Sequence, residues 1–518
     1  MSRPRIRALR HCAVVAIAVL ALIGRAGVSA AQTNYERGSP FSGGSGGHSG
    51  GGNAAGVAIG IGAALAIGAL IAASQSQAAT RPRGDEDDWR GNVRDNPPPR
   101  PFHHTPTPPP NPPSAPSSAA SPPAPRFTIA RGETRFVPNE VLVEVGRGVT
   151  PAQIAAIERR LKLVRLSEES FVLAGRTIYR YRLPDGVRLP AVLAALSRER
   201  RVASAQPNYR FSTPRATFKL ASSGTAAATI DPSLLYAPRA LRLAEAHQMA
   251  RGDRVLVAVI DSAVDPAHPE LAGALAKSLD VTGTDGTAAP HSHGTGMAGA
   301  LAARAQLVGV APGASLVAIT AFRPEGEGAG GTTVTVLRAL DAAFAEGARV
   351  VNMSFAGPRD ALLGRALAGA HERGLILVAA AGNAGPKSPP LYPAADRNVI
   401  AVTATDADDK VFDLANRGRH VTIAAPGVDV LVPGPEGAYA FTSGTSVAAA
   451  HVSGVVALML ERDPTLSADA VRAALAASAR DLGRKGRDEV YGAGEADANA
   501  AVRQFDKRTA SPAAPIAR

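Results

Sequence analysis

Cysteine is nearly missing from this 518-residue chain, and acidic residues are fewer than basic ones. The single cysteine, Cys12, lies at the start of an N-terminal apolar run, so no disulfide framework is available. Stability must come from core packing, which 45% apolar residues at this length can supply. Lysine and arginine number 56 against 44 aspartate and glutamate. The excess consists of scattered arginines without a recognisable nucleic-acid-binding fold, so we expect no nucleic-acid partner.

The first 31 residues are predicted to be a secretory signal peptide. Four arginines precede the apolar run 12–24, and the small residues at 28–30 follow where a signal is cleaved. Removal of residues 1–31 would take Cys12 with it and leave a chain without thiols. We therefore expect an exported protein that is periplasmic, associated with the cell envelope or secreted.

Residues 32–80 are Gly/Ala-rich, and their apolar part, 54–73, is long enough to span a bilayer. Gly56 and Gly60 have the spacing of packed membrane helices. A cleaved signal followed by a membrane span would, however, leave the rest of the chain in the cytoplasm. Two interpretations stay open: a membrane anchor, or a translocated segment that associates with membrane or protein or is lost on maturation. Residues 81–126, charged and then proline-rich, are expected to be a disordered spacer.

Residues 127–212 show strand and helix patterns in a βαββαβ-like order. Strand alternation and helical spacing of apolar residues mark strands at 141–145, 176–183 and 202–211 and helices at 151–161 and 189–196. This order predicts a small ferredoxin-like α+β domain with two helices on one face of its sheet.

Apolar strands and helical patterns alternate again through residues 236–505. A helix at 332–346 precedes a strand at 350–351, and a helix at 362–373 precedes a strand at 375–379. Such alternation predicts an α/β sandwich with a mainly parallel sheet. Ser467 is suited to cap a helix at 468–477.

Two segments of this region place polar side chains at strand or helix ends. Asp261 follows six apolar residues of a buried strand, at the edge where α/β sheets bind ligands. His293 lies where a loop becomes a helix of small residues, and Gly294 lets another backbone approach closely. Each residue alone is as well explained by a solvated turn.

A third segment, Thr442-Ser443-Gly444-Thr445-Ser446, turns at glycine and enters a helix at Ser446. The N-terminus of a helix stabilises negative charge, as a nucleophile that generates an oxyanion requires. An ordinary serine cap is the alternative. A fourth segment, 378–385, contains Asn383 in an Ala-Gly-Asn-Ala-Gly run.

Together, in the order Asp, His, Ser, these four segments resemble the subtilisin family of serine proteases. The resemblance covers about residues 235–505 and implies a subtilisin-like three-layer sandwich. It implies Asp261, His293 and Ser446 as the catalytic triad, and Asn383 with the Ser446 N–H as the oxyanion hole. It implies no metal and no cofactor, and protein or peptide substrates. The substrate-binding residues that it implies are Gly330, Gly331, Ser354, Phe355, Ala356, Ala380, Ala381 and Gly382.

Residues 127–212 in turn resemble the family's inhibitory propeptide, including its Gln-Pro-Asn-Tyr ending at 206–209. The resemblance implies that this domain is a partner of the catalytic domain, 236–505, and that self-cleavage occurs in the linker 213–235. A permanent accessory domain is the alternative. Residues 506–518 are expected to be a disordered tail.

The chain also departs from the family pattern. Val447 and Ala450 replace Met and Pro in the nucleophile helix, and the bulky Phe355 is expected to reshape a subsite. The short stretch 300–310 lacks the Asn-rich insertion that forms a strong calcium site in many relatives, so we expect that site to be absent. Weaker loop sites were considered at three scattered carboxylates, Asp265, Asp280 and Asp285.

Two other classes of function compete with a protease. A degenerate protease fold that only binds would be favoured if any of the four polar site residues were replaced, and all four are intact. A structural surface or envelope protein built around the Gly/Pro-rich region, with the protease part incidental, is the other. The sequence therefore predicts an exported serine endopeptidase made as a self-processing zymogen.

Overall fold

The computed structural model describes five stretches of the chain. The described residues are 126–213, 219–220, 230–283, 288–326 and 328–505. The predicted signal peptide, the Gly/Ala-rich segment with its apolar stretch 54–73, nearly all of the spacer and the C-terminal tail lie outside them. Among the described helices, none is both long and apolar enough to cross a bilayer.

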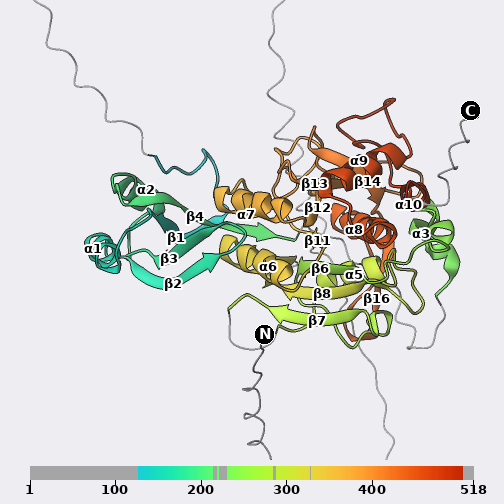
Figure 1. The fold of residues 1–518 in the computed structure, drawn as a ribbon, viewed down its shortest axis with the longest axis horizontal. Helices are drawn as coiled ribbons and strands as arrows, with labels where there is room; N and C mark the ends of the chain where they lie inside the picture. Colours follow the sequence, from blue (N-terminus) through green and yellow to red (C-terminus); the bar gives the residue numbers. More distant parts are fainter. Residues whose placement is uncertain (1–125, 214–218, 221–229, 284–287, 327, 506–518) are drawn as a thin grey trace, which may run out of the picture. The chain divides into compact units, whose positions relative to one another are not determined.

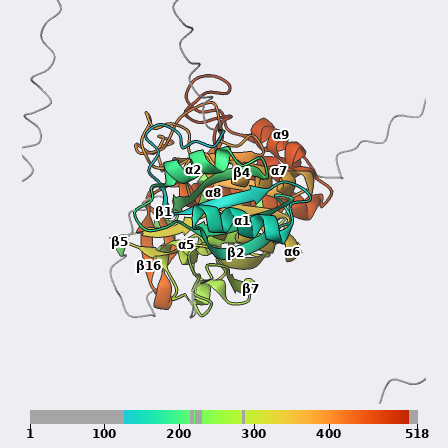
Figure 2. The same ribbon diagram turned by 90° about the vertical axis from the view of Figure 1, so that its left-hand side faces the viewer.

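Residues 126–213, here called the small unit, form an antiparallel sheet with two helices on one face (Figure 2). The elements are β1 Phe136–Val145, α1 Pro151–Leu161, β2 Val164–Phe171, β3 Arg176–Arg182, α2 Leu189–Ser197 and β4 Val202–Ser212. The strand order β2-β3-β1-β4 confirms the predicted ferredoxin-like arrangement. Strand β2 had not been predicted, because it is mostly polar and exposed.

Local sequence explains why these elements begin where they do. Thr150 and Gln153 form a capping box at the start of α1, and Pro151 occupies the first turn, where a missing N–H costs nothing. Alternate residues of β1 then face opposite ways. Val141 and Val143 pack under α1 and α2, whereas Leu142 lies in a core shared with the rest of the protein.

Residues 230–505, here called the large unit, are built on a seven-stranded sheet of order β14-β13-β12-β11-β6-β8-β7 (Figure 1). The strands are β6 Leu256–Asp261, β7 Leu275–Asp280, β8 Ser315–Thr320, β11 Val350–Met353, β12 Ile376–Ala380, β13 Val399–Thr405 and β14 Val421–Pro426. All six pairings between neighbouring strands of this sheet are parallel. The predicted α/β sandwich with a mainly parallel sheet is thereby confirmed.

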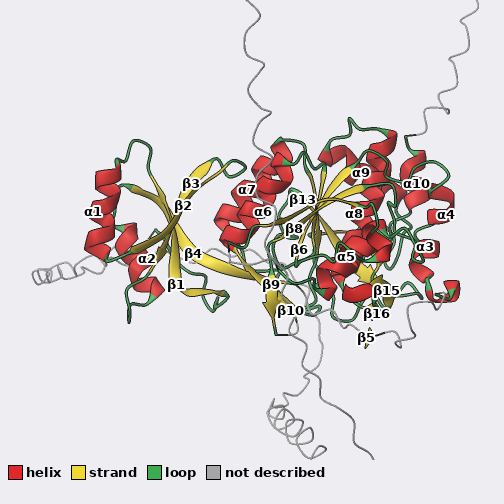
Figure 3. Cartoon of the chain, turned by 90° about the horizontal axis from the view of Figure 1, so that it is seen from below, coloured by secondary structure: helices red, strands yellow, loops and turns green. Residues whose placement is uncertain are grey.

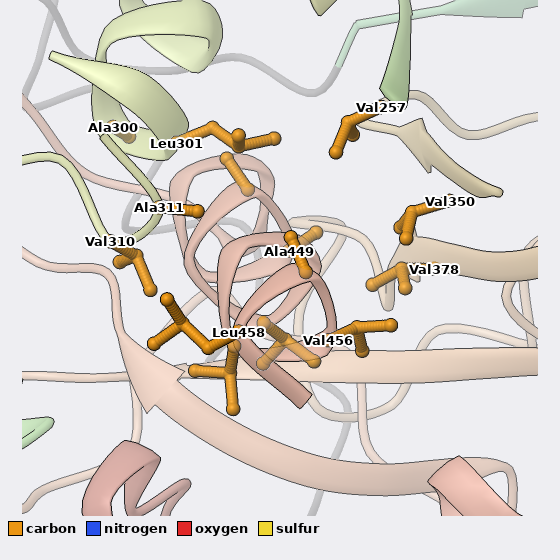
Figure 4. Close-up of a cluster of buried hydrophobic side chains, with 14 of the residues drawn as sticks. Val257, Ala300, Leu301, Val310, Ala311, Val350, Val378, Ala449, Val456 and Leu458 are labelled. Carbon is orange, nitrogen blue, oxygen red and sulfur yellow. The ribbon is translucent and has the colours of Figure 1, made fainter. Parts of the chain in front are cut away.

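Helices cover both faces of this sheet, which makes three layers (Figure 3). Their bounds are α5 Ser292–Ala302, α6 Thr333–Ala345, α7 Ala361–Glu372, α8 Thr445–Arg462, α9 Ala468–Ser478 and α10 Ala498–Arg503. Val257 of β6 faces the core around α5 and α8, and its neighbour Ala258 faces the core around α6 and α7. Figure 4 shows Val257, Val350 and Val378 of adjacent strands turned toward the α8 helix.

Shorter elements complete the large unit. They are the helices α3 Tyr236–Ala240 and α4 Leu243–Ala246 and the strand pairs β9 Arg323–Glu325 with β10 Gly328–Thr332 and β15 Val430–Pro433 with β16 Tyr439–Thr442. Strand β5, Lys219–Leu220, lies inside the segment 213–235 that was predicted to be a linker. It pairs with β16, so part of that segment is ordered. Ser467 caps α9 as predicted, through the Ala470 N–H at 3.2 Å.

Candidate active site

Asp261 ends the buried strand β6 and is itself 1% exposed. Its Oδ1 accepts hydrogen bonds from the Ser262 N–H and from the His293 ring nitrogen Nδ1, each at 2.7 Å. Because an ionised carboxylate only accepts, Nδ1 carries the ring proton and Nε2 is the basic nitrogen. The first two predicted residues, far apart in sequence, are therefore brought into direct contact.

His293 lies in the first turn of α5, held against the end of β6 by the glycine that follows it. A Cβ on Gly294 would lie 2.1 Å from the Ser262 carbonyl oxygen. Any side chain there would push the helix away from the strand and separate His293 from Asp261. The predicted close approach at Gly294 is confirmed.

Ser446 lies in the first turn of α8, which begins one residue earlier than predicted, at Thr445. Backbone N–H groups of a first turn have no acceptor within the helix, and the helix dipole adds positive potential there. The Ser446 hydroxyl is 3.4 Å from the Ser354 carbonyl oxygen. Helix α8 packs against α5, so the helices that carry Ser446 and His293 are neighbours (Figure 3).

Asn383 follows β12 and is oriented by Thr445. Its Oδ1 accepts from the Thr445 N–H at 3.0 Å and from the Thr445 hydroxyl at 2.8 Å. With the oxygen so held, the amide nitrogen must point the other way. That nitrogen lies 2.7 Å from where a Cβ on Gly444 would be, so a side chain before α8 would displace the Asn383 amide. The amide is thus placed beside the residue that precedes the Ser446 turn.

The end of strand β4 lies between two segments predicted to bind substrate. Ser212 pairs with Gly330 of β10 on one side. On the other side, the Ser212 N–H donates to the Ala356 oxygen and the Ala356 N–H donates to the Ser212 oxygen, both at 2.9 Å. The Thr213 N–H donates to the Ala329 oxygen at 2.9 Å. A strand of the small unit therefore fills a slot that is closed by backbone hydrogen bonds on both edges.

The side chain of Phe211 is enclosed beside this slot. It is 1% exposed and meets Phe355 edge to face, with ring centroids 6.1 Å apart. A Cβ on Gly357 would lie 2.3 Å from the Phe211 ring, and Phe322 packs on Phe355 at 4.8 Å. Phe355, predicted to reshape a subsite, forms a wall of this aromatic pocket.

The predicted residues Ala380, Ala381 and Gly382 are buried at the end of β12 and just after it. The Gly382 N–H donates to the Thr445 hydroxyl at 3.1 Å, and a Cβ on Gly382 would lie 2.9 Å from the Leu391 side chain. This segment therefore lies next to the start of α8.

Several residues that position the site were not predicted. Thr445 orients Asn383, and Asn416 holds the following turn by accepting the Ala384 N–H at 2.8 Å. Ser262 and His291 adjoin the Asp261–His293 pair, with the Ser262 hydroxyl 3.0 Å from the His291 Nδ1. A signal was available for these two, since each is a polar residue within two positions of a predicted catalytic residue.

Two of the three candidate calcium ligands, Asp265 and Asp280, lie among the described residues, and each has other partners within the chain. Asp265 accepts the Ala267 and Glu436 N–H groups, whereas Asp280 forms an ion pair with Arg323 at 2.7 Å. Asp285 lies outside the described residues. Within the described ranges, no group of three or more potential metal ligands comes together.

Comparison with known proteins agrees with this geometry. Residues 252–494 match the family described as Peptidase_S8, Subtilase family. Subtilisin DY from Bacillus licheniformis is 36% identical over 243 residues, which are 45% of this chain and 86% of that protein. The chain belongs to the subtilase family. Thermitase from Thermoactinomyces vulgaris is 35% identical over 246 residues, which are 46% of this subtilase and 86% of thermitase.

The structural comparison reaches beyond the matched family domain. This subtilase resembles fervidolysin from Fervidobacterium pennivorans, described as a keratinolytic enzyme related to subtilisin, with a TM-score of 0.61 and 25% identity. The likeness covers 73% of this chain and 62% of fervidolysin, less than two thirds of the latter. The protein is a serine endopeptidase of subtilisin-like fold that acts on peptide or protein substrates.

Proposed function

We propose that this subtilase is an exported serine endopeptidase, made as a zymogen that its own active site processes. Asp261, His293 and Ser446 are its triad. The observation that carries the catalytic part is the Asp261–His293 hydrogen bond of 2.7 Å beside the helix that begins at Thr445 with Ser446 in its first turn.

In this mechanism the Ser446 hydroxyl attacks the scissile carbonyl carbon while His293 Nε2 takes its proton. The imidazolium that forms is stabilised by Asp261, which keeps its negative charge. The Ser446 N–H and the Asn383 side-chain amide bind the oxyanion. His293 then protonates the leaving amine, and water hydrolyses the acyl-enzyme by the same steps in reverse order.

The zymogen proposal is supported by the strand β4 in the slot between Gly330 and Ala356. Main-chain pairing of this kind is how an extended peptide binds a sheet edge. Here the bound peptide is part of the chain itself, and it excludes a second one. We infer that the small unit is an inhibitory propeptide with its cleavage site in the segment 213–235.

Contacts away from the slot also support an inhibitory partner. Asp341 of α6 accepts the N–H groups of Val172 and Leu173 at 2.7 and 3.0 Å. Arg338 forms a two-pronged ion pair with Glu169 at 2.6 and 2.7 Å. The small unit is thus fixed on α6 independently of the strand that it inserts.

The aromatic pocket leads to a substrate preference within the same proposal. Because Phe211 fills the pocket of Phe322, Phe355 and Gly357, substrates with a large apolar residue at the equivalent position should be cleaved best. Export is proposed from the signal-like residues 1–31. The stretch 54–73 adds no support for a membrane anchor, since it lies outside the described residues.

The test is intact-mass and N-terminal analysis of the protein produced without its signal, beside Ser446→Ala. A wild-type fragment that starts between residues 213 and 236, with an intact variant, supports the triad and the propeptide together. Fluorophosphonate labelling of Ser446 without processing would retain the enzyme and remove the propeptide. Two intact chains without labelling would remove the catalytic proposal.

A further inference from the structure

A second histidine, His291, contacts the machinery around His293. It is the N-cap of α5, and its Nδ1 accepts the His293 backbone N–H at 3.3 Å. The same Nδ1 lies 3.0 Å from the Ser262 hydroxyl. The His291 ring is partly buried, and the His291 N–H is fixed by the Ala263 oxygen at 2.8 Å. His291 therefore contacts His293 itself and Ser262, the residue next to Asp261.

The Ser262 hydroxyl has three polar neighbours and a single proton to donate. Its oxygen accepts the Gly294 N–H at 3.1 Å, so its proton is left for one of two acceptors. One is Asp261 Oδ1 at 3.1 Å, which already accepts two hydrogen bonds at 2.7 Å. The other is His291 Nδ1 at 3.0 Å. The protonation state of His291 decides which acceptor receives the proton.

We propose that His291 is a positioning residue for catalysis: its unprotonated Nδ1 holds the His293 backbone and shares the Ser262 hydroxyl with Asp261, and protonation of Nδ1 disrupts both. A protonated Nδ1 becomes a donor. It then faces the His293 N–H, another donor, across 3.3 Å, and the bond that caps α5 is lost. Because Nδ1 is then no longer an acceptor, the Ser262 hydroxyl donates its hydrogen bond to Asp261 Oδ1.

Two titratable groups act on the His291 ring: Asp261 at the end of β6 and His293 in the first turn of α5. Burial and the neighbouring His293 lower the pKa of His291, and the charge on Asp261 raises it by a smaller amount. The net direction is downward, so His291 is unprotonated and an acceptor at neutral pH. Charging it at acid pH also places a cation beside His293, which weakens that base.

The inference rests on the proposed triad, and its test uses the full chain after self-processing. His291→Ala removes the acceptor, whereas His291→Asn keeps an acceptor oxygen on a side chain of similar reach that cannot be protonated. His247→Asn is the matched control, because His247 is also half-buried with a pKa lowered by burial, but its ring bonds to the Val310 backbone oxygen. Active sites are counted by fluorophosphonate, and melting temperatures are compared at pH 8.

We expect His291→Ala to lower kcat about tenfold at unchanged KM, which is the effect of losing one hydrogen bond. His291→Asn should retain most of the wild-type kcat. On the acid side of the pH profile, log kcat/KM of the wild type should fall with decreasing pH at a slope approaching 2, since two histidines must lose a proton before the enzyme is active. His291→Asn should fall with slope 1, and His247→Asn should match the wild type.

Two results would overturn the inference: wild-type kcat and slope in His291→Ala, or an Asn variant that melts like the wild type and yet is as slow as Ala. Neither result would argue against the proposed triad. An inactive wild type that fluorophosphonate does not label would instead remove the triad, so the two failures are distinguishable.

Discussion

The small unit and the large unit bury their sheets differently. In the large unit, helices of the same unit cover both faces of the parallel sheet. In the small unit, α1 and α2 cover one face, and residues of the other face such as Leu142 and Ile178 share a core with α6 and α7. The large unit therefore has a complete core of its own, whereas the small unit depends on its partner.

This difference is what we expect if the small unit is the removable inhibitor that we propose. Once the small unit is detached, buried residues such as Phe171 and Phe211, 4% and 1% exposed, face water. Each large apolar side chain exposed in this way costs about 2 kcal/mol, a large part of the stability of so small a domain. We expect the detached small unit to unfold easily and to become a substrate.

The largest expected effect belongs to the chemistry of the large unit alone. Ser446→Ala should lower kcat on the order of 10⁶-fold, the loss known for the same change in subtilisin. The small unit should then stay attached and folded, because cleavage and not folding depends on the hydroxyl. Peptide hydrolysis and intact mass measure the two effects. A variant chain that is cut at the same position without added protease would contradict self-processing.

Asn383→Ala should have the next largest effect. Loss of the amide that we propose to bind the oxyanion should lower kcat about 10²–10³-fold with little change in KM, as found for the corresponding asparagine of subtilisin. Asn398→Ala is a suitable control, since the Asn398 side chain donates a hydrogen bond to Asp396 within its own turn. Steady-state kinetics on a peptide amide checks this, and a loss seen mainly in KM would argue against an oxyanion role.

The two units should also respond differently to acid, since residues 126–213 contain no histidine. His451 of α8 is fully buried, and burial lowers its pKa from 6.5 to about 4. Between these values the unfolded chain binds a proton that the folded chain does not, so stability falls as pH drops from about 6.5 to about 4. The gap between the two pKa values corresponds to about 3 kcal/mol.

Hydrogen exchange by segment in the Ser446→Ala chain measures this loss. Protection in α8 should fall between pH 6.5 and 4 after correction for intrinsic rates, while the core of the small unit changes much less. His451→Asn, which keeps a donor toward the Pro426 oxygen, should remove most of the pH dependence. An unchanged dependence in that variant would assign the acid sensitivity to other groups.

The sequence predicted the fold of the large unit well because its signals are local. Six apolar residues before Asp261 and a glycine after His293 are enough to indicate a strand end and a close approach. Asn416 acts through a contact with Ala384, which is distant from it in sequence, and no pattern near Asn416 indicates that contact. Strand β2 was missed for a related reason, since its polar residues lie at an exposed edge of the sheet and show no alternation.

The smallest expected effect lies at the contact between the two units, where two glycines of α7 form a matched pair. A Cβ on Gly369 would lie 2.0 Å from the Leu173 oxygen of the small unit, whereas the nearest atom to a Cβ on Gly364 is 3.8 Å away. Either change to alanine should stabilise α7 by up to about 1 kcal/mol through helix propensity. Only Gly369→Ala should push the Leu173 backbone away and weaken the hydrogen bonds that the Val172 and Leu173 N–H groups donate to Asp341.

Two such bonds correspond to about 2 kcal/mol, or roughly a 10- to 100-fold loss of protection around residues 171–174. Hydrogen exchange of Ser446→Ala chains that carry one or the other glycine change measures it. Equal protection in the two chains would mean that the small unit is held by the strand in the slot and not by this contact. A loss confined to Gly369→Ala would show that the small unit is fixed on the large unit at two separate places, so that cleavage after β4 is not by itself enough to release it.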